Sequence, residues 1–274
     1  MSRQKSFPGK TNLSKQRDRF KIMDMNLYLE TIGCQEPLNP DQPSLFKLQR
    51  HHLLHVPFEN LDIHYQREII LDPEAIYEKV VLRKRGGFCY ELNGLFYTLL
   101  NYIGFKCHMI SARVYKSRDE YGPEFDHMAL LVEVEAQWYL VDVGFGKFSL
   151  EPLPLKEQMQ IKDNHGLFIF DRYDQHYWRI NSIVNGKTVP EYIFTTIPRE
   201  LKSFESMCHH HQHNPASHFT RQKVISKALE DGRLTLSEGS IKITRSGQTQ
   251  EEAITPELFE TRLRDLFGIR MNQR

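Results

Sequence analysis

One stretch of the sequence decides the fold, and it reads Arg85-Gly86-Gly87-Phe88-Cys89-Tyr90-Glu91-Leu92-Asn93. Its two glycines allow a tight backbone turn directly before a helix, whose apolar residues recur at intervals of three and four, namely Leu92, Phe96, Leu99, Leu100 and Ile103. Cys89 therefore stands in the first turn of that helix, where the positive end of the helix dipole favours a reactive thiolate. The alternative is that Cys89 packs beneath the helix, as most isolated cysteines do.

Upstream of this helix the apolar pattern is also helical, and residues 24–105 predict a small helical bundle. One apolar face begins at Met25, and a second helix begins near Ser44. A third helix opens with Asp72 as its N-cap and Pro73 at its first position, which is where proline is tolerated best.

Downstream of this helix the sequence changes to short β-type runs at 107–115, 128–134, 138–143, 167–173, 176–183 and 190–195. Because no helix intervenes between them, residues 106–197 favour an antiparallel sheet or barrel over a parallel sheet. Residues 198–274 combine a hairpin around Glu238-Gly239 with a last helix that starts at Thr255-Pro256. We expect this final part to be a mixed α/β unit.

His127 begins one of the β-type runs, and Asp142 lies near the end of the next. A two-residue turn at Val134-Glu135 places His127 opposite Asp142, whereas a turn centred one residue later pairs Asp142 with Ala129 and leaves His127 as a diagonal neighbour. In both registers the imidazole and the carboxylate project from one face of a hairpin. Such a carboxylate stabilises the imidazolium that forms when the ring takes a thiol proton, so we predict a catalytic site of Cys89, His127 and Asp142.

Two further patterns carry weaker signals. The glycines of Gly144-Phe145-Gly146 let backbone N–H groups approach a phosphate or an oxyanion, so we predict that these three residues bind a coenzyme. Cys208-His209-His210-His211-Gln212-His213, with His218 close behind, contains residue types that bind transition metals. It lacks a second cysteine pair and adjoins the turn signal Asn214-Pro215. We therefore expect a solvated histidine-rich loop and no metal site.

The composition limits the class of protein. The chain has 274 residues with 36 Lys+Arg against 35 Asp+Glu, so no overall charge favours nucleic acid or a membrane surface. No apolar run approaches the roughly 20 residues that a spanning helix needs, and no secretory signal is evident. Four widely spaced cysteines without a C-x-x-C pair indicate free thiols. We expect a cytoplasmic protein whose residues 1–23, rich in Lys and Arg, form a flexible basic tail.

Three segments together resemble the active-site segments of the arylamine N-acetyltransferases of the bacterial type. They are the stretch 85–93, His127-Met128-Ala129-Leu130-Leu131-Val132 and Val141-Asp142-Val143-Gly144-Phe145-Gly146. The intervals of 38 and 15 positions that separate Cys89, His127 and Asp142 also resemble that family's arrangement. Two other segments are similar to its P-F-E-N-L and P-x-S-x-F segments, namely Val56-Pro57-Phe58-Glu59-Asn60-Leu61 and Asn214-Pro215-Ala216-Ser217-His218-Phe219.

The resemblance implies an α+β fold on a papain-like cysteine-enzyme core, with an N-terminal helical bundle, a central antiparallel β-barrel and a C-terminal α/β lid. It implies that Cys89 takes the acetyl group from acetyl-coenzyme A, that His127 activates the thiol and that Asp142 orients His127. An arylamine, arylhydroxylamine or hydrazine then accepts the acetyl group, in a ping-pong mechanism without a metal. Glu59 and Arg85 resemble the family's buried ion pair, to which we assign a structural role.

Two other classes remain as alternatives. A transglutaminase-like or peptidase-type cysteine enzyme uses the same Cys-His-Asp order, although transglutaminase-like sites usually place Trp after the cysteine, where this chain has Tyr90, and the papain-type C-G-x-C-W signature is absent. A non-enzymatic metal-binding or partner-binding protein would use the histidine-rich segment. This second alternative leaves the three matching segments without an explanation.

Overall fold

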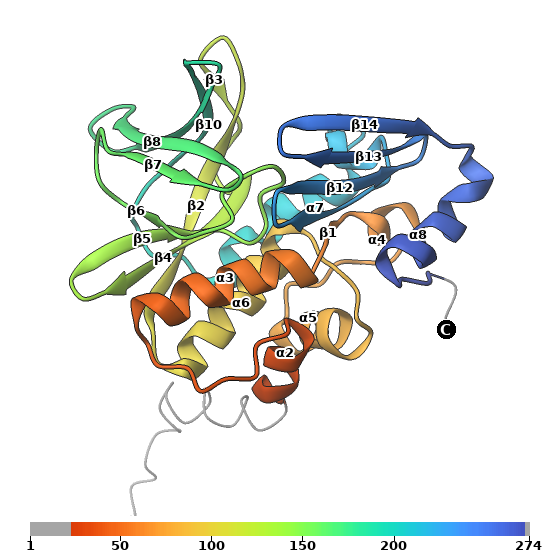
Figure 1. The fold of residues 1–274 in the computed structure, drawn as a ribbon, viewed down its shortest axis with the longest axis horizontal. Coiled ribbons are helices and arrows are strands. Elements are labelled where there is room, and N and C mark those ends of the chain that lie inside the picture. The colour runs from red at the N-terminus through yellow and green to blue at the C-terminus, as the bar shows by residue number, and fades with distance from the viewer. Residues whose placement is uncertain (1–22, 272–274) are drawn as a thin grey trace, which may run out of the picture.

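The computed structural model describes residues 23–271, so the predicted basic tail, apart from Met23, lies outside the described residues. Helices come first along the chain, followed by a large antiparallel sheet that curves into an almost closed barrel (Figure 1). A smaller antiparallel sheet with flanking helices completes the chain. The predicted α+β fold class is confirmed.

The N-terminal region is helical, as its apolar periodicity predicts. It contains α2 (Met25–Thr31), α3 (Gln42–His55), α4 (Leu61–His64), α5 (Pro73–Tyr77), the π-helical turn η1 (Glu78–Leu82) and α6 (Cys89–Ile103). The carboxylates of Asp24, Asp41 and Asp72 each accept a backbone N–H in the first turn of α2, α3 and α5, at 2.9, 3.0 and 3.0 Å. The predicted start of a helix at Asp72-Pro73 is therefore confirmed.

The larger sheet forms the barrel. Its strands are β2 (Lys106–Ser117), β3 (Glu120–Tyr121), β4 (His127–Val134), β5 (Gln137–Val141), β6 (Leu153–Pro154), β7 (Gln160–Asp163), β8 (Gly166–Arg172), β9 (Trp178–Val184) and β10 (Lys187–Phe194). They pair in the order β6-β5-β4-β2-β10-β9-β8-β7, with β3 added to β2. The six predicted runs correspond to β2, β4, β5, β8, β9 and β10. Sequence reasoning missed β3, β6 and β7, which are too short to show a clear alternation.

The hairpin of β4 and β5 adopts the later of the two predicted registers. Leu130 pairs with Val141, which leaves Asp142 just beyond the last pair and diagonal to His127. The turn residues Glu135 and Ala136 have φ angles of +51° and +62°. Two successive positive φ values suit a two-residue hairpin turn. Glutamate and alanine are not typical of such a turn, whereas the pair Asn-Gly is. The sequence therefore left the register open.

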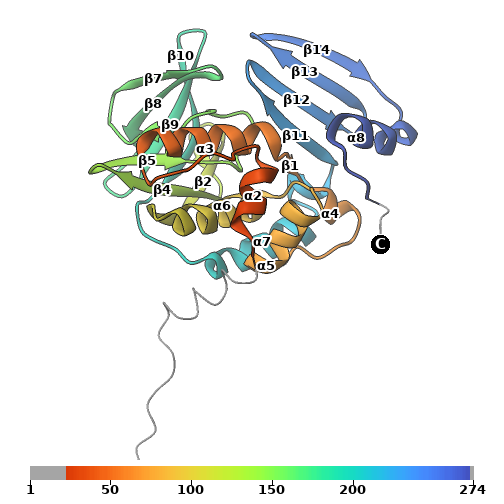
Figure 2. The ribbon, with the colours of Figure 1, turned by 60° about the horizontal axis from the view of Figure 1, so that its bottom comes forward.

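The C-terminal region contains η2 (Leu201–Phe204), α7 (Glu205–His213), η3 (His218–Thr220), β11 (Val224–Leu229), β12 (Gly232–Ser237), β13 (Ser240–Arg245), β14 (Gln248–Ala253), η4 (Pro256–Leu258) and α8 (Phe259–Phe267). The predicted hairpin around Glu238-Gly239 joins β12 to β13. The sheet has a fifth strand from far upstream, β1 (Phe58–Glu59), which pairs with β11 (Figure 2). The C-terminal sheet is thus hydrogen-bonded to the N-terminal region.

Helix α6 lies at the centre of the largest apolar core. It contacts β2 and β4 on one side and α5 on another, and Leu92, Phe96 and Leu99 have no exposed surface. A helix enclosed in this way has little freedom to shift along its axis. The residue at its start is therefore held in a fixed place between the bundle and the barrel. Within residues 23–271, none of the helices combines the length and apolar character that crossing a bilayer requires.

The turn between β4 and β5 yields a test of stability. Replacing Ala136 with Gly should raise the free energy of unfolding by about 1 kcal/mol, because alanine is strained at positive φ and glycine is not. The hairpin of β9 and β10 offers the reverse control, since Gly186 has a φ of +74°. Gly186→Ala should lower the free energy of unfolding by a similar amount in urea titrations. A loss of stability in Ala136→Gly would contradict the assigned turn geometry.

Candidate active site

Cys89 is the first residue of α6 and is 4% exposed. The backbone of Phe88 before it is extended, and the Glu91 side chain accepts the Phe88 N–H at 2.8 Å. This contact satisfies one of the backbone donors that the start of a helix leaves without a partner. The predicted position of Cys89 in the first helical turn is confirmed.

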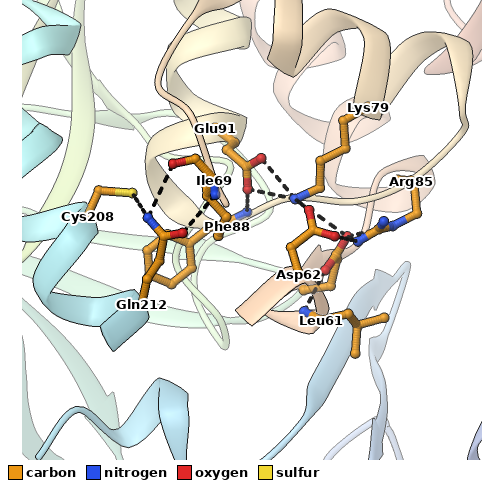
Figure 3. A network of polar contacts seen from close by, with 10 residues as sticks. Leu61, Asp62, Ile69, Lys79, Arg85, Phe88, Glu91, Cys208 and Gln212 are labelled. Carbon is orange, nitrogen blue, oxygen red and sulfur yellow. Dashed lines mark hydrogen bonds and ion pairs between the residues drawn. The ribbon is translucent and has the colours of Figure 1, made fainter. Parts of the chain in front are cut away.

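A buried network of charged groups lies beneath this helix start (Figure 3). Arg85 Nε donates to Glu59 at 2.9 Å, and Arg85 Nη2 donates to Asp62 at 3.0 Å. Lys79 Nζ lies 2.7 Å from Asp62 and 2.9 Å from Glu91. The predicted pair of Glu59 and Arg85 is confirmed as one part of this network. Sequence reasoning missed Asp62, Lys79 and Glu91, because their spacing gives no sign that they meet.

The network shifts the pKa values of its members in opposite directions. Burial works to raise the pKa of Asp62, but Lys79 and Arg85 outweigh it and hold that pKa below its usual range. For Glu91 burial is the larger effect and raises the pKa, although contact with Lys79 opposes it. Burial works to lower the pKa of Lys79, yet the carboxylates of Glu59, Glu91 and Asp62 outweigh it and raise that pKa. Lys79 is therefore the cation that links the other groups.

The loop before Cys89 is also held by its backbone. The Gly87 N–H donates to the Pro57 carbonyl at 3.2 Å, and the Glu59 N–H donates to the Gly87 carbonyl at 2.9 Å. A Cβ atom on Gly86 would lie 2.1 Å from the Pro57 oxygen, so only glycine fits there. The segment that contains Pro57 and Glu59 thus fixes the path of the chain into α6.

His127 and Asp142 are in direct contact. His127 Nε2 lies 2.7 Å from Asp142 Oδ2, and both side chains are almost completely buried. Because an ionised carboxylate can only accept, Nε2 carries the hydrogen and Nδ1 is left as the basic nitrogen. Asp142 accepts further hydrogen bonds from Asn93 at 3.0 Å, from the Gly144 N–H at 2.9 Å and from the Tyr192 hydroxyl at 3.1 Å. These contacts fix the carboxylate in one orientation.

Asn93 connects this pair to the helix that carries Cys89. Its Nδ2 donates to the Met128 carbonyl at 2.7 Å as well as to Asp142, and its Oδ1 accepts the Val143 N–H at 2.9 Å. One side chain thereby joins α6 to the strand that begins at His127 and to the segment after β5. The sequence pattern predicts neither these contacts of Asn93 nor the hydrogen bond from Tyr192 to Asp142.

The environment of Cys89 opposes an isolated thiolate. Burial raises the pKa of the thiol well above its ordinary value, and nearby Cys208 and Asp142 add to the rise. A hydrogen bond with the Met128 backbone lowers the pKa in part. Cys89 and His127 line the same cavity. A thiolate can form here when the proton moves to a neighbouring base, so that an ion pair replaces a single buried charge.

The cavity has a volume of about 620 Å³, and all three residues of the predicted coenzyme loop line it. Gly144 lies against Cys89, because a Cβ atom there would stand 2.8 Å from Cys89 Cα. The Phe145 ring centroid lies 5.0 Å from that of His127. A Cβ atom on Gly146 would meet nothing within 4 Å. Gly144 thus has a packing role, whereas Gly146 faces open space.

The expectation of a solvated histidine-rich loop is wrong. Residues 205–213 form helix α7, and His211 is 5% exposed. Its Nε2 lies 3.3 Å from Asp126 Oδ1, and its ring packs beside Phe88 and Phe219. The burial of His211 could not be predicted, because a run of histidines in a sequence does not show which side chain faces inward. In the part of the chain that the structure describes, no group of three or more His, Cys, Asp or Glu residues is arranged to hold a metal ion.

Comparison with known proteins assigns the family. A family model described as N-acetyltransferase matches residues 41–274. Arylamine N-acetyltransferase 1 of Homo sapiens is 33% identical, over 77% of this chain and 79% of that protein. Arylamine N-acetyltransferase 2 of Mus musculus is 29% identical, over 92% of this chain and 96% of that protein. The chain belongs to the arylamine N-acetyltransferase family.

Solved structures of arylamine N-acetyltransferases share the fold. The enzyme of Salmonella typhimurium superposes with a TM-score of 0.84 at 30% identity, over 91% of this chain and 92% of that one. The Mycobacterium marinum enzyme in complex with CoA gives a TM-score of 0.83 at 28% identity, over 90% and 93%. The chain is therefore an arylamine N-acetyltransferase, which decides against the transglutaminase-like and the non-enzymatic alternatives.

The buried network yields a test of stability. Lys79→Met should lower the free energy of unfolding by about 3–5 kcal/mol, because it leaves buried carboxylates without their shared cation. Arg83 provides a matched control, since it makes an exposed ion pair with Glu78. Arg83→Met should change the free energy of unfolding by less than about 1 kcal/mol in urea titrations. Equal losses in the two variants would show that the network does not stabilise the helix start.

The coenzyme loop yields a second test. Gly144→Ala should lower the free energy of unfolding by about 1–3 kcal/mol, because its Cβ atom would press on Cys89 Cα and on Asn93. Gly146→Ala should stay within about 0.5 kcal/mol of the parent protein, since its Cβ atom meets open space. Thermal unfolding of both variants checks the difference. An unchanged melting temperature in Gly144→Ala would contradict the close packing of this loop against Cys89.

Proposed function

We propose that this arylamine N-acetyltransferase works by a ping-pong mechanism with acetyl-coenzyme A as donor and an acetylated Cys89 as intermediate. The observation that carries the proposal is the contact of 2.7 Å between Asp142 and His127, which lines the same cavity as Cys89. The related Mycobacterium marinum structure is in complex with CoA, which supports acetyl-coenzyme A as the acetyl donor.

In the first half-reaction, His127 Nδ1 takes the proton of the Cys89 thiol while Asp142 stabilises the imidazolium. The thiolate attacks the thioester carbonyl carbon, a C–S bond to Cys89 forms, and the C–S bond to the coenzyme breaks. The coenzyme leaves as a thiol after receiving the proton from His127. The acyl group is now held on the protein, and the donor site is free.

In the second half-reaction, an arylamine, arylhydroxylamine or hydrazine attacks the carbonyl carbon of the acetyl-cysteine. A C–N or C–O bond to the acceptor forms, and the C–S bond to Cys89 breaks. His127 takes a proton from the attacking nitrogen or oxygen and returns it to the departing Cys89 sulfur, which restores the resting state. Aromatic side chains that line the cavity, among them Phe58, Phe145 and Phe219, offer an apolar surface for the acceptor ring.

Both half-reactions pass through a tetrahedral oxyanion that needs hydrogen-bond donors. The Gly144 N–H already donates to Asp142, so it is engaged elsewhere. We assign the oxyanion to the Cys89 N–H, which lies in the first helical turn, and to the N–H groups of Phe145 and Gly146. The predicted coenzyme loop would then serve the reacting carbonyl as well as the coenzyme.

The proposal predicts that acetyl-coenzyme A alone acetylates Cys89. Intact-protein and peptide mass spectrometry should detect a mass increase of one acetyl group on Cys89, and none in Cys89→Ser. Cys208→Ser provides a matched control, since it removes a second buried thiol and should still acquire the acetyl group. Folded, reduced protein with an unmodified Cys89 would overturn the mechanism.

In the same assay Asp142→Asn should slow acetylation by about 10³- to 10⁴-fold, because an amide does not stabilise the imidazolium. It should remain folded, since its side-chain oxygen can still accept hydrogen bonds from Asn93 and Gly144. Asp171→Asn makes the same chemical change on the barrel, where Asp171 pairs with Arg179, and should keep the parent rate. A parent-like rate in Asp142→Asn would remove Asp142 from the mechanism.

A further inference from the structure

Arg233 lies on the face of the C-terminal sheet that looks into the catalytic cavity. In β12 the residues alternate between two faces, and Leu234 and Leu236 pack into the apolar core that includes α8. Arg233 and Thr235 stand on the opposite face and line the cavity together with Cys89 and His127. Arg233 also lines a smaller hollow formed by residues 143–146. It therefore stands beside the loop that touches the nucleophile.

The guanidinium of Arg233 has no counter-ion within the described residues. Its Nη1 donates to Ser226 Oγ at 3.1 Å, and its Nε is buried without a hydrogen-bond partner there. Burial, with no carboxylate to offset it, lowers the pKa of Arg233 to about 10. Arg85, by contrast, is held by the carboxylates of Glu59 and Asp62. A half-buried guanidinium with an enclosed Nε and no acidic partner among the described residues is costly for stability, which points to a ligand as its partner.

The surroundings of Arg233 favour an anion as that partner. The lining of the cavity also contains Lys116 and Lys147, against Asp126 as its one acid among the described residues. Asp126 is already engaged by His211 at 3.3 Å. Beside Arg233, the hydroxyls of Ser226 and Thr235 lie 2.7 Å apart and supply further hydrogen-bonding groups. The chain thus presents a guanidinium fork and two hydroxyls with little negative charge near them.

We infer that Arg233 is the anion-binding residue of the catalytic cavity and pairs with a phosphate or carboxylate group of a substrate. This inference rests on the proposed function, because it assigns the anion to one of the two substrates. A guanidinium binds both groups through two parallel N–H···O contacts, which fix the orientation of the ligand as well as adding affinity. The anion is either the diphosphate of the coenzyme or a carboxylate on the ring of the acceptor.

The two sources are separated by changing one substrate at a time in Arg233→Gln. In the donor arm, kcat/KM is measured with acetyl-coenzyme A and with p-nitrophenyl acetate, which carries no phosphate. In the acceptor arm, it is measured with 4-aminobenzoate and with 4-methylaniline, which has a methyl group in place of the carboxylate. We expect a loss of about 10- to 100-fold for the anionic member of one arm, and less than a 3-fold change for its neutral counterpart.

Two further variants separate binding from folding. Arg233→Lys keeps the charge but loses the fork and should recover part of the lost kcat/KM. Arg245 lies on the neighbouring strand β13 and makes an exposed ion pair with Asp231 in the turn before β12, and Arg245→Gln should leave all four values unchanged. Because none of residues 23–271 is a counter-ion of this guanidinium, Arg233→Gln should melt at the parent temperature or above. The stabilisation of the parent protein by CoA relative to pantetheine, and by 4-aminobenzoate relative to 4-methylaniline, provides a readout without turnover.

Equal changes for the anionic and neutral members of both arms, including no change at all, would overturn the inference. A melting temperature of Arg233→Gln several degrees below that of the parent, with no preference of the parent for the anionic ligands, would also overturn it and indicate a structural role. Either result would leave acetylation of Cys89 in the parent protein untouched. Failure of this inference is therefore distinct from failure of the proposed mechanism.

Discussion

The buried contact of Lys79 with Asp62 and Glu91 is the constraint on which the rest of the site depends. Through Glu91 it fixes the first turn of α6, and through Asp62 it reaches Arg85 and the loop that leads to Cys89. Ionic groups of this kind do not add much net stability, but they penalise every arrangement that leaves one of them unpaired. The network therefore specifies where Cys89 stands, while the apolar core around α6 keeps the helix in place.

A second set of contacts links the start of α6 to the barrel. Asn93 joins α6 to the start of β4 and to Asp142, so the thiol, the imidazole and the carboxylate are set by one connected group of side chains. The C-terminal sheet contributes to the lining of the cavity. It pairs with β1, next to the loop before Cys89, and turns Arg233 toward the cavity. The N-terminal helices, the barrel and the C-terminal sheet thus all contribute residues to the lining of one cavity.

The sequence was sufficient for features that depend on local spacing. Cap residues such as Asp72, the period of α6 and the alternation of the longer strands predicted most elements. Three short segments led to the hypothesis of a site of Cys89, His127 and Asp142, whose catalytic roles stay a prediction, and the structure places His127 and Asp142 in contact. It was insufficient where contacts join distant parts of the chain. Nothing in its pattern brings Lys79 to Glu91 or β1 to β11, and the Glu135-Ala136 turn left the register of the hairpin open. The prediction of a solvated loop at the histidine run was wrong, because the polarity of a segment does not show which of its side chains is buried.

We propose that Cys89 ionises in this environment because His127 receives its proton. The most direct test of this proposal is the rate of alkylation of Cys89 by iodoacetamide as a function of pH, in the parent protein and in His127→Gln. Burial alone raises the pKa of the thiol, so the variant should react appreciably only above the ordinary range of a cysteine, whereas the parent should react rapidly at neutral pH. Superimposable pH profiles for the two proteins would contradict the account.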